Sequence, residues 1–197
     1  MVRVAIDNLG TTEPSTSNSP RRFSPVRDVT GSPVPVLYAG DSLACAFGET
    51  VFHDLPDDPS APATILRADL ISLRAGFISL ARDLELLDLT EDGLRSQHLS
   101  RSDVVAIPPS AYSRTVVWGQ RAWDSGRAAG IVWNSRRTRD QLAYLLFVDP
   151  PRPADAARAV NRSADLHVRQ PPLPLFDGIG LGNVLEAATE RNVTVLL

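Results

Sequence analysis

Two polar side chains lie at the junction of a predicted strand and a predicted helix. Tyr38 ends the strand, and Glu49 is the one charged side chain in the helix that follows Asp41. Glu49 lies off the apolar face of this helix, on the side of the small residues Cys45 and Gly48, which leaves room for a ligand. A carboxylate and a phenol that border one cleft can bind a small molecule. Taken singly, the acid can instead be solvated, and the phenol can be a core residue with a hydrogen-bonded hydroxyl.

A second polar group follows the apolar segment 130–133, which is predicted to be a strand. Ser135, Arg136 and Arg137 bring a hydroxyl and two guanidinium groups to the end of this strand. The segment alone can be an ordinary polar turn. A basic patch that includes Arg139 is disfavoured, because an acid follows and no aromatic side chains alternate with the arginines. We interpret the segment as a solvated turn or as the phosphate-facing wall of a pocket.

The composition excludes several classes of chemistry. All 20 basic residues are arginines, so no lysine can form a Schiff base or bind phosphate in a P-loop. The single cysteine and the three scattered histidines show no metal-ligand spacing, so we predict no metal. The net charge of -3 gives no basic field for nucleic acid or for an anionic membrane surface. A small molecule or a protein is therefore the expected partner.

Two other segments do not support a phosphate-binding loop or a membrane span. Residues 177–182, Asp-Gly-Ile-Gly-Leu-Gly, break the spacing of a dinucleotide-binding loop and follow a proline-rich stretch instead of a clear strand. The apolar start of the chain ends at Asp7, and no uncharged run elsewhere approaches the roughly 18 residues of a membrane span. We therefore expect a cytoplasmic protein with no membrane contact and no direct contact with nucleic acid.

The elements that must position these side chains alternate irregularly along the chain. Strands are predicted over residues 34–38, 64–68, 77–81, 84–89, 130–133, 142–148 and 193–197. Helices are predicted over about residues 41–52, 90–98, 112–123, 154–160 and 183–190, with Asp41 and Thr90 as N-caps of the first two. A long loop is predicted over residues 7–35, and a proline-rich loop between residues 160 and 183.

This order lacks the regular strand–helix alternation of a doubly wound fold. It predicts an α+β fold instead, with a bent mixed β-sheet flanked by helices. The length of 197 residues and an apolar content of 43% favour a single domain over residues 1–197. Within it, residues 151–197 are expected to supply the C-terminal helices and the last strand.

Four segments together resemble the RES domain, a family of bacterial toxins named for its Arg, Glu and Ser residues. Their order and spacing follow the family pattern over about residues 20–150. The segments are Arg22-Phe23-Ser24-Pro25, Val36-Leu37-Tyr38-Ala39, Ala46-Phe47-Gly48-Glu49-Thr50-Val51-Phe52 and Gly130-Ile131-Val132-Trp133-Asn134-Ser135-Arg136-Arg137. The resemblance implies a fold similar to that of ADP-ribosyltransferases.

The resemblance also implies which residues form the site. Arg22, Tyr38, Glu49 and Ser135 match the family's site positions, and Arg136 is expected beside them as a further NAD-binding residue. The first of these positions has an alternative. Many members of the family have two glycines before the arginine and a shorter run to the tyrosine. Here a proline and an arginine come first and the loop is long, so Arg27 is the second candidate for this position.

The activity that the resemblance implies is the degradation of NAD, by phosphorolysis or hydrolysis, or the transfer of its ADP-ribose to a protein. Breaking the nicotinamide–ribose bond builds positive charge on the ribose, and a carboxylate such as Glu49 can face that charge. An arginine can bind the pyrophosphate, Tyr38 can stack on the nicotinamide, and Ser135 can hydrogen-bond to ribose or phosphate. NAD is thus expected as the substrate, without a metal.

The resemblance further implies a toxin–antitoxin pair. The cognate antitoxin is expected to be an Xre-like helix-turn-helix protein that blocks the cleft. Two other functions stay open at the level of sequence. The protein can be an ADP-ribosyltransferase that modifies a cellular protein, or a non-enzymatic binding module that has kept the fold. The long loop over residues 7–35 is the only feature of the sequence that hints at a binding module.

Overall fold

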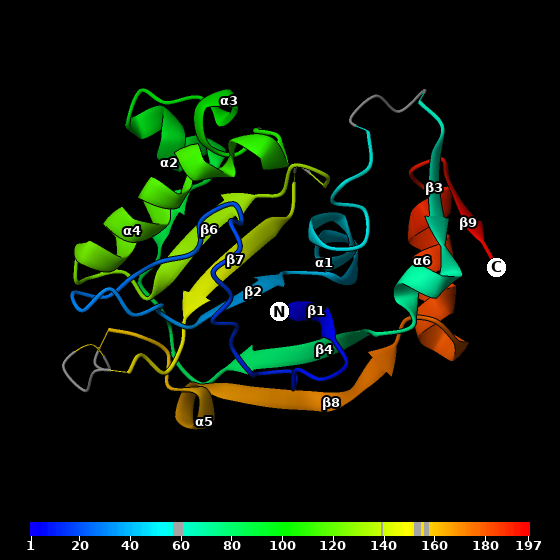
Figure 1. Cartoon of the computed structure of the whole chain (residues 1–197), viewed down its shortest axis with the longest axis horizontal. Coiled ribbons are helices and arrows are strands. Elements are labelled where there is room, and N and C mark those ends of the chain that lie inside the picture. The colour runs from blue at the N-terminus through cyan, green and yellow to red at the C-terminus, as the bar shows by residue number, and fades with distance from the viewer. Residues whose placement is uncertain (57–60, 139, 152–154, 156–157) are drawn as a thin grey trace.

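The structure is a computed structural model, and it describes residues 1–56, 61–138, 140–151, 155 and 158–197 (Figure 1). In chain order the strands are β1 (Val2–Ile6), β2 (Val36–Gly40), β3 (Ala63–Leu66), β4 (Leu73–Leu80), β5 (Leu87–Leu89), β6 (Gly130–Asn134), β7 (Leu142–Phe147), β8 (Leu166–Pro174) and β9 (Val193–Leu196). The α-helices are α1 (Leu43–Glu49), α2 (Glu91–Ser96), α3 (Arg101–Val104), α4 (Val116–Asp124), α5 (Arg162–Asp165) and α6 (Gly178–Thr189). The 3-10 helices are η1 (Arg67–Leu70) and η2 (Pro109–Arg114).

A seven-stranded mixed sheet forms the centre of the molecule. Its strand order is β5-β6-β7-β2-β1-β4-β8, and β3 and β9 form a separate parallel pair. Within the large sheet β5 and β6 are parallel, whereas the other neighbours are antiparallel. The prediction of a single α+β domain with a mixed sheet is therefore confirmed.

The ladder of this sheet is nearly interrupted between β1 and β2. These neighbours are paired only where Val2 lies opposite Gly40. In contrast, β1 pairs with β4 along its whole length, and β2 pairs in the same way with β7. The sheet thus consists of two halves that share one pair of residues, and α1 lies over the place where they part (Figure 1).

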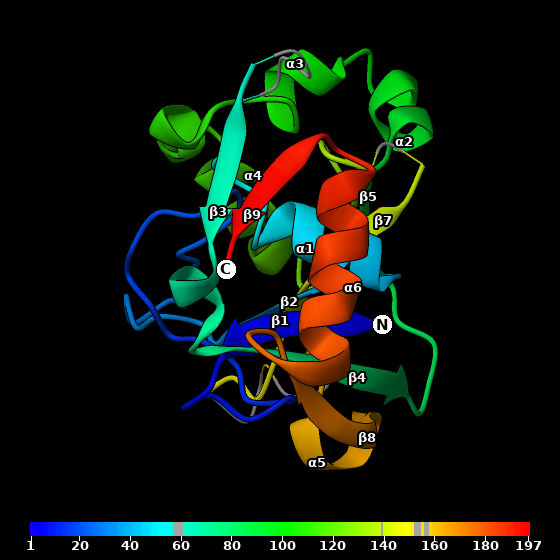
Figure 2. The same cartoon turned by 90° about the vertical axis from the view of Figure 1, so that its right-hand side faces the viewer.

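Helices pack on the two halves of the sheet and bury two of its three apolar cores, while a third core around Leu37, Ile78 and Leu146 joins the halves. Helices α2, α3 and α4 lie at the β6 end, whereas α6 and the β3–β9 pair stand at the other end (Figures 1 and 2). Trp123 of α4 packs on Phe147 of β7, with ring centroids 5.2 Å apart. The second core joins α1 and α6 to β1 and β4, around Phe47 and Val184. Each of these two helix-covered cores holds one half of the sheet rigid.

Two strands differ from the sequence-based prediction. Residues 2–6 form β1, an interior strand between β2 and β4, although their short V-R-V-A-I pattern is no strong strand signal. Arg3 of this strand is buried, and its guanidinium donates to the carbonyls of Gly10 and Thr11 across a turn. Residues 166–174 form β8, where the sequence predicts a proline-rich loop. Its prolines are tolerated because β8 is an edge strand, whose outer N–H groups need no partner in the sheet.

Several element boundaries also differ. Helix α1 is capped by Ser42, whose hydroxyl accepts from Cys45 N at 3.0 Å, and the predicted cap Asp41 is wrong. The Asp41 carboxylate instead accepts from Leu142 N at 2.8 Å. Helix α6 begins at Gly178, five residues before the predicted start, so the glycine-rich segment is helical. Residues 154, 156 and 157 of the helix predicted over 154–160 lie outside the described residues, and the prediction is wrong for residues 158–160, where Val160 forms a parallel bridge with Val148.

The long loop over residues 7–35 is confirmed as a segment without helices or strands, but it is well packed. Phe23, Val26 and Val34 are buried in the core beneath α4. A Cβ at Gly119 of α4 would collide with the carbonyl oxygen of Phe23, so glycine permits this close approach. None of the helices in the described part of the chain is both long and apolar enough to span a membrane.

Candidate active site

A cavity of about 420 Å³ lies where β1 and β2 part. Val2 and Val4 of β1 form an apolar part of its wall, and Tyr38 of β2 lies beside them. The polar part of the wall comes from the loop before β2, from α1 and the segment after it, and from η2. The ionisable side chains of this polar part include Arg21, Arg22, Glu49, His53, Asp54 and Tyr112.

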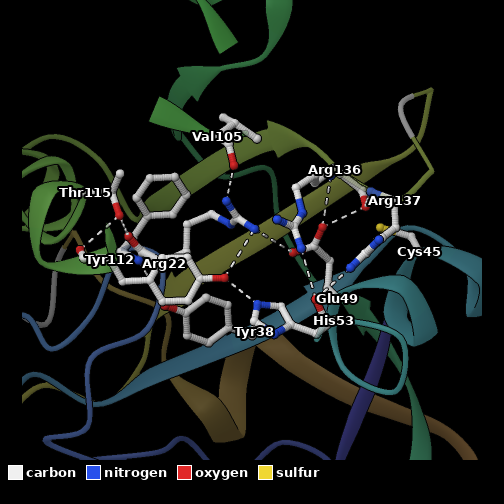
Figure 3. Close-up of polar contacts among 12 residues, drawn as sticks. Arg22, Tyr38, Cys45, Glu49, His53, Val105, Tyr112, Thr115, Arg136 and Arg137 are labelled. Carbon is white, nitrogen blue, oxygen red and sulfur yellow. Dashed lines mark hydrogen bonds and ion pairs between the residues drawn. The ribbon is translucent and has the colours of Figure 1, made fainter. Parts of the chain in front are cut away.

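One oxygen of the Glu49 carboxylate is held by hydrogen bonds, and the other lies at the cavity (Figure 3). Its Oε1 accepts from the Ser135 hydroxyl at 2.7 Å and from Arg136 N at 3.2 Å. Its Oε2 lies 3.9 Å from Arg22 Nη2, beyond hydrogen-bond length, and has no donor among the described residues. The Glu49 side chain is 17% exposed. It is therefore a fixed acid at a cavity and not a solvated helix residue.

Ser135 lies behind Glu49 and supports it. The side chain is fully buried, and its hydroxyl accepts from Arg137 N at 3.1 Å and Thr138 N at 3.3 Å while it donates to Glu49. A Cβ at Gly48 would lie 2.8 Å from Arg137 Cβ, so glycine lets this turn approach α1. The structure thus brings Ser135 to Glu49 as predicted, but as a support for the carboxylate, outside the residues that line the cavity.

Arg22 is fixed in a buried position by the opposite wall. Its Nη1 donates to the carbonyl of Val105, and its Nη2 donates to the Tyr112 hydroxyl at 3.4 Å (Figure 3). The carbonyl of Arg22 accepts from the Thr115 hydroxyl. Only 4% of the side chain is exposed. A buried guanidinium beside a carboxylate keeps a positive charge in the cavity wall, which suits an anionic ligand.

The alternative arginine lies elsewhere. Arg27 is exposed, and its guanidinium donates to the Gly31 carbonyl at 2.9 Å and to Asn18 Oδ1 at 3.2 Å within its own loop. It does not line the cavity. The geometry therefore favours Arg22 over Arg27 as the arginine of the site.

Tyr38 presents a neutral phenol to the cavity. Its hydroxyl is 3.0 Å from Ser24 Oγ and accepts from Phe23 N at 3.4 Å. Burial raises the pKa of Tyr38 to about 12, and these two hydrogen bonds oppose the rise only in part. Its ring packs edge-on against Trp133, with centroids 6.2 Å apart. Tyr38 thus offers an aromatic surface, as the sequence predicts, and no anionic base.

Arg136 and Arg137 hold the segment that follows α1. Their Nη2 atoms donate to the His53 carbonyl at 3.0 and 2.9 Å, and Arg137 Nη1 donates to the Pro56 carbonyl at 3.0 Å. Neither guanidinium lines the cavity. The prediction that Arg136 binds NAD stays a prediction, while its backbone N–H takes part in holding Glu49.

Several polar residues that line the cavity, among them Asp54, were absent from the predicted site. Arg21 precedes the site arginine, His53 follows Glu49 by four residues, and Tyr112 is far away in sequence. Because α1 ends at Glu49, His53 lies beyond the helix, and its nearness to Glu49 in sequence is the signal that could have suggested it. Tyr112 has no such signal, because only the tertiary structure places η2 over Arg22.

Neither thiol nor metal chemistry is indicated by the described residues. Burial raises the pKa of Cys45 to about 12, and the nearby Glu49 adds to the rise. Because a thiolate is the reactive form of cysteine, this protonated thiol is not a nucleophile at neutral pH. In the described part of the chain, no group of three or more His, Cys, Asp or Glu side chains is placed to hold a metal ion.

The fold and the site define an α+β protein in which a buried acid and a buried arginine meet at a cavity in a divided sheet. A model of the RES domain family matches residues 5–173 of the 197-residue chain. The protein therefore belongs to the RES domain family. This family is associated with toxin-like function and with enzymes that act on NAD. No curated protein matches the chain.

Proposed function

We propose that this protein binds NAD in the cavity between β1 and β2 and cleaves its nicotinamide–ribose bond. The observation that carries the proposal is the orientation of Glu49. One of its oxygens is held by Ser135 and Arg136, and the other lies at the cavity 3.9 Å from Arg22. A carboxylate fixed in this way cannot turn away when a positive charge develops in front of it.

This arrangement suits the chemistry of the bond. As nicotinamide leaves, the ribose acquires oxocarbenium character, and Glu49 Oε2 can stabilise that charge or bind the ribose hydroxyls. A preorganised electrostatic contact of this kind contributes about 3 kcal/mol to the transition state, on the order of a hundredfold in rate. The acid needs no proton of its own for this role, because the nicotinamide leaves as a neutral ring.

The rest of the cavity suits the rest of NAD. Val2, Tyr38 and Trp133 offer apolar and aromatic surface for a base ring, and Arg21 and Arg22 offer positive charge for the pyrophosphate. The indole N–H of Trp133 is buried without a hydrogen-bond partner among the described residues. A volume of about 420 Å³ falls within the range of small-molecule pockets.

In the cell, we propose, the protein is the toxin of a toxin–antitoxin pair and depletes NAD in the cytoplasm. A cognate antitoxin of the Xre-like helix-turn-helix type would hold it inactive by covering the cavity. Expression of the wild-type chain alone is expected to lower cellular NAD and stop growth, and co-expression of the protein encoded beside it is expected to restore both. Unchanged NAD on expression of the folded protein would contradict this role.

The reaction itself is tested with NAD labelled in the adenylate. Purified protein is expected to bind NAD in calorimetry and to release nicotinamide, with free ADP-ribose formed in water and ADP-ribose 1-phosphate when phosphate is present. A labelled protein band would instead identify transfer of ADP-ribose to a protein. Binding of NAD without nicotinamide release would identify a binding module.

The choice of arginine is tested with a matched pair of variants. Arg22→Gln is expected to weaken NAD binding about 10- to 100-fold, because a hydrogen bond or ion pair with a charged group is worth about 1.5 to 3 kcal/mol. Arg27→Gln, which removes an exposed guanidinium outside the cavity, is expected to stay within about twofold of wild type. Calorimetry measures both, with the melting temperature as a check on folding. Equal effects of the two changes would remove Arg22 from the site.

A further inference from the structure

A second chain of polar groups lines the same cavity, and the role of Glu49 leaves it unexplained. Asp54 Oδ1 lies 2.8 Å from His53 Nδ1. His53 Nε2 is hydrogen-bonded to the Tyr112 hydroxyl (Figure 3). That hydroxyl accepts from Arg22 Nη2 at 3.4 Å. When Nδ1 donates to Asp54, Nε2 is the acceptor of the imidazole and Tyr112 is its donor. The chain therefore runs from an exposed carboxylate to a phenol at the buried end.

The buried end of this chain meets the proposed reaction centre. Arg22 Nη2 lies 3.4 Å from the Tyr112 hydroxyl and 3.9 Å from Glu49 Oε2, so one nitrogen separates the phenol from the acid. Tyr112 and Glu49 line the same cavity, so a ribose held against Glu49 can approach the Tyr112 hydroxyl. Burial raises the pKa of Tyr112, although Arg22 opposes the rise, so the phenol stays protonated. It can pass a proton on, but it is not a phenolate.

We propose that Tyr112 and His53 form the relay that takes the proton from the water molecule attacking the ribose; this inference rests on the proposed cleavage of NAD. The water oxygen bonds to C1′ of the ribose, and the C1′–N bond breaks with its electron pair moving to the nicotinamide. The proton of the water goes to the Tyr112 oxygen as the phenol gives its own proton to His53 Nε2. The resulting imidazolium is stabilised by Asp54, which is 85% exposed and opens a path to solvent.

The relay distinguishes between two acceptors. Water must lose a proton as it attacks, so its attack depends on a base. The phosphate dianion attacks through an oxygen that already carries negative charge, so it needs no base. The His53 imidazole therefore favours hydrolysis over phosphorolysis, and its removal is expected to shift the products toward the phosphate ester.

A purely structural role for this imidazole is not required by its surroundings. The carbonyl of His53 already accepts from Arg136 and Arg137, and these bonds hold the segment after α1. A change of the side chain leaves that carbonyl in place. His53→Gln is therefore a suitable variant, and His167→Gln on the exposed edge strand β8 is its matched control.

The test measures ADP-ribose and ADP-ribose 1-phosphate from NAD for the wild type and both variants, with and without phosphate. His53→Gln is expected to lower hydrolysis about 100-fold or more, which is the usual contribution of a general base. Phosphorolysis should fall much less, so the ratio of phosphate product to water product rises at least about tenfold. Tyr112→Phe is expected to shift this ratio in the same direction, and His167→Gln is expected to leave it unchanged. Added imidazole is expected to restore part of the hydrolysis in His53→Ala.

The outcomes separate this inference from the function on which it rests. If the wild type releases nicotinamide but both products fall equally in His53→Gln and Tyr112→Phe, without rescue by imidazole, the pair only positions Arg22 and the relay is wrong. Unchanged hydrolysis in folded His53→Gln likewise rejects the relay and leaves NAD cleavage standing. If the folded wild type releases no nicotinamide at all, the proposed function fails and the relay fails with it.

Discussion

Two pairs of an acid and an arginine in this protein have different roles. Glu49 and Arg22 face each other at 3.9 Å beside the cavity, with side chains that are 17% and 4% exposed. Asp165 and Arg82 lie at 3.0 Å where α5 meets the segment after β4, and Asp165 does not line the cavity. The first pair is loose and the second is closely hydrogen-bonded.

The second pair uses both oxygens of its acid. Asp165 Oδ1 accepts from Arg82 Nε at 3.0 Å, and Oδ2 accepts from Asn161 N at 2.9 Å. Arg82 also donates to the Ala159 carbonyl at 3.0 Å. Burial raises the pKa of Asp165, but the hydrogen bonds from Arg82 and Asn161 outweigh it and hold the pKa below 3.8. This acid is satisfied within the protein and stabilises a chain connection.

The difference shows how an acid becomes available for a ligand. Glu49 has one oxygen engaged and the other facing a guanidinium beyond hydrogen-bond length, so part of its bonding capacity is unused in the free protein. Glu49 therefore contributes less to the stability of the free protein and keeps an oxygen for a ligand. Asp165, in contrast, uses both of its oxygens to stabilise the fold. Variants of the two acids should therefore separate activity from stability.

The largest expected effect is on turnover, from Glu49→Gln. The amide oxygen of the glutamine can still accept from Ser135 and Arg136, but the negative charge at the cavity is lost. We expect turnover of NAD to fall about 100-fold or more, equivalent to about 3 kcal/mol, with a nearly unchanged free energy of unfolding. Nicotinamide release and urea unfolding measure the two quantities. Near-normal turnover by the purified variant would reject the role of Glu49.

The opposite pattern is expected for Asp165→Asn. Its amide can replace only one of the two accepting oxygens, so the free energy of unfolding should fall by about 1 to 3 kcal/mol. Turnover per folded molecule should stay within about twofold of wild type, because a change remote from the site leaves its contacts in place. Urea unfolding and nicotinamide release are again the measurements. A large loss of turnover in the folded variant would show that Asp165 also affects activity, which would contradict the proposed difference between the two pairs.

The same variant shows a pH dependence of known sign. Because the pKa of Asp165 is lower in the folded protein than its ordinary value of 3.8, its contribution is fully present above that value. It is lost as the pH falls through the lower folded pKa. The difference in stability between wild type and Asp165→Asn should thus shrink on acidification below 3.8. A difference that grows in acid would contradict the hydrogen-bond account.

The smallest expected effect is that of Ser135→Ala. The Ser135 hydroxyl donates to Glu49 from behind at 2.7 Å, so its loss lets the carboxylate turn without removing its charge. We expect kcat to fall about tenfold, or about 1.4 kcal/mol, with a smaller change in KM. Ser125→Ala is the control, because Ser125 donates to the Ala122 carbonyl at the end of α4. A change confined to KM would indicate that Ser135 contacts the substrate directly.

Those parts of the fold and site that depend on neighbours in sequence could be predicted. The strand–helix junction that carries Tyr38 and Glu49 follows from a short apolar run and helical spacing within 12 residues, although the predicted cap lay one residue too early. The N-cap Thr90, which accepts from Gly93 N at 3.4 Å, is confirmed for the same reason. Ser135 was predicted beside Glu49 only through the resemblance to the RES domain, because nothing local links residues so far apart.

The sequence by itself determined the family, the α+β class and the local elements around the acid, since each depends on residue types and short spacings. The tertiary structure decided that residues 2–6 enter the sheet between β2 and β4 and pair with β2 through one residue pair, which leaves the cavity open. It also decided that Tyr112 lies over Arg22 and that Arg27 points elsewhere. These features depend on packing between distant segments, and no pattern in a short stretch of sequence encodes which segments will meet.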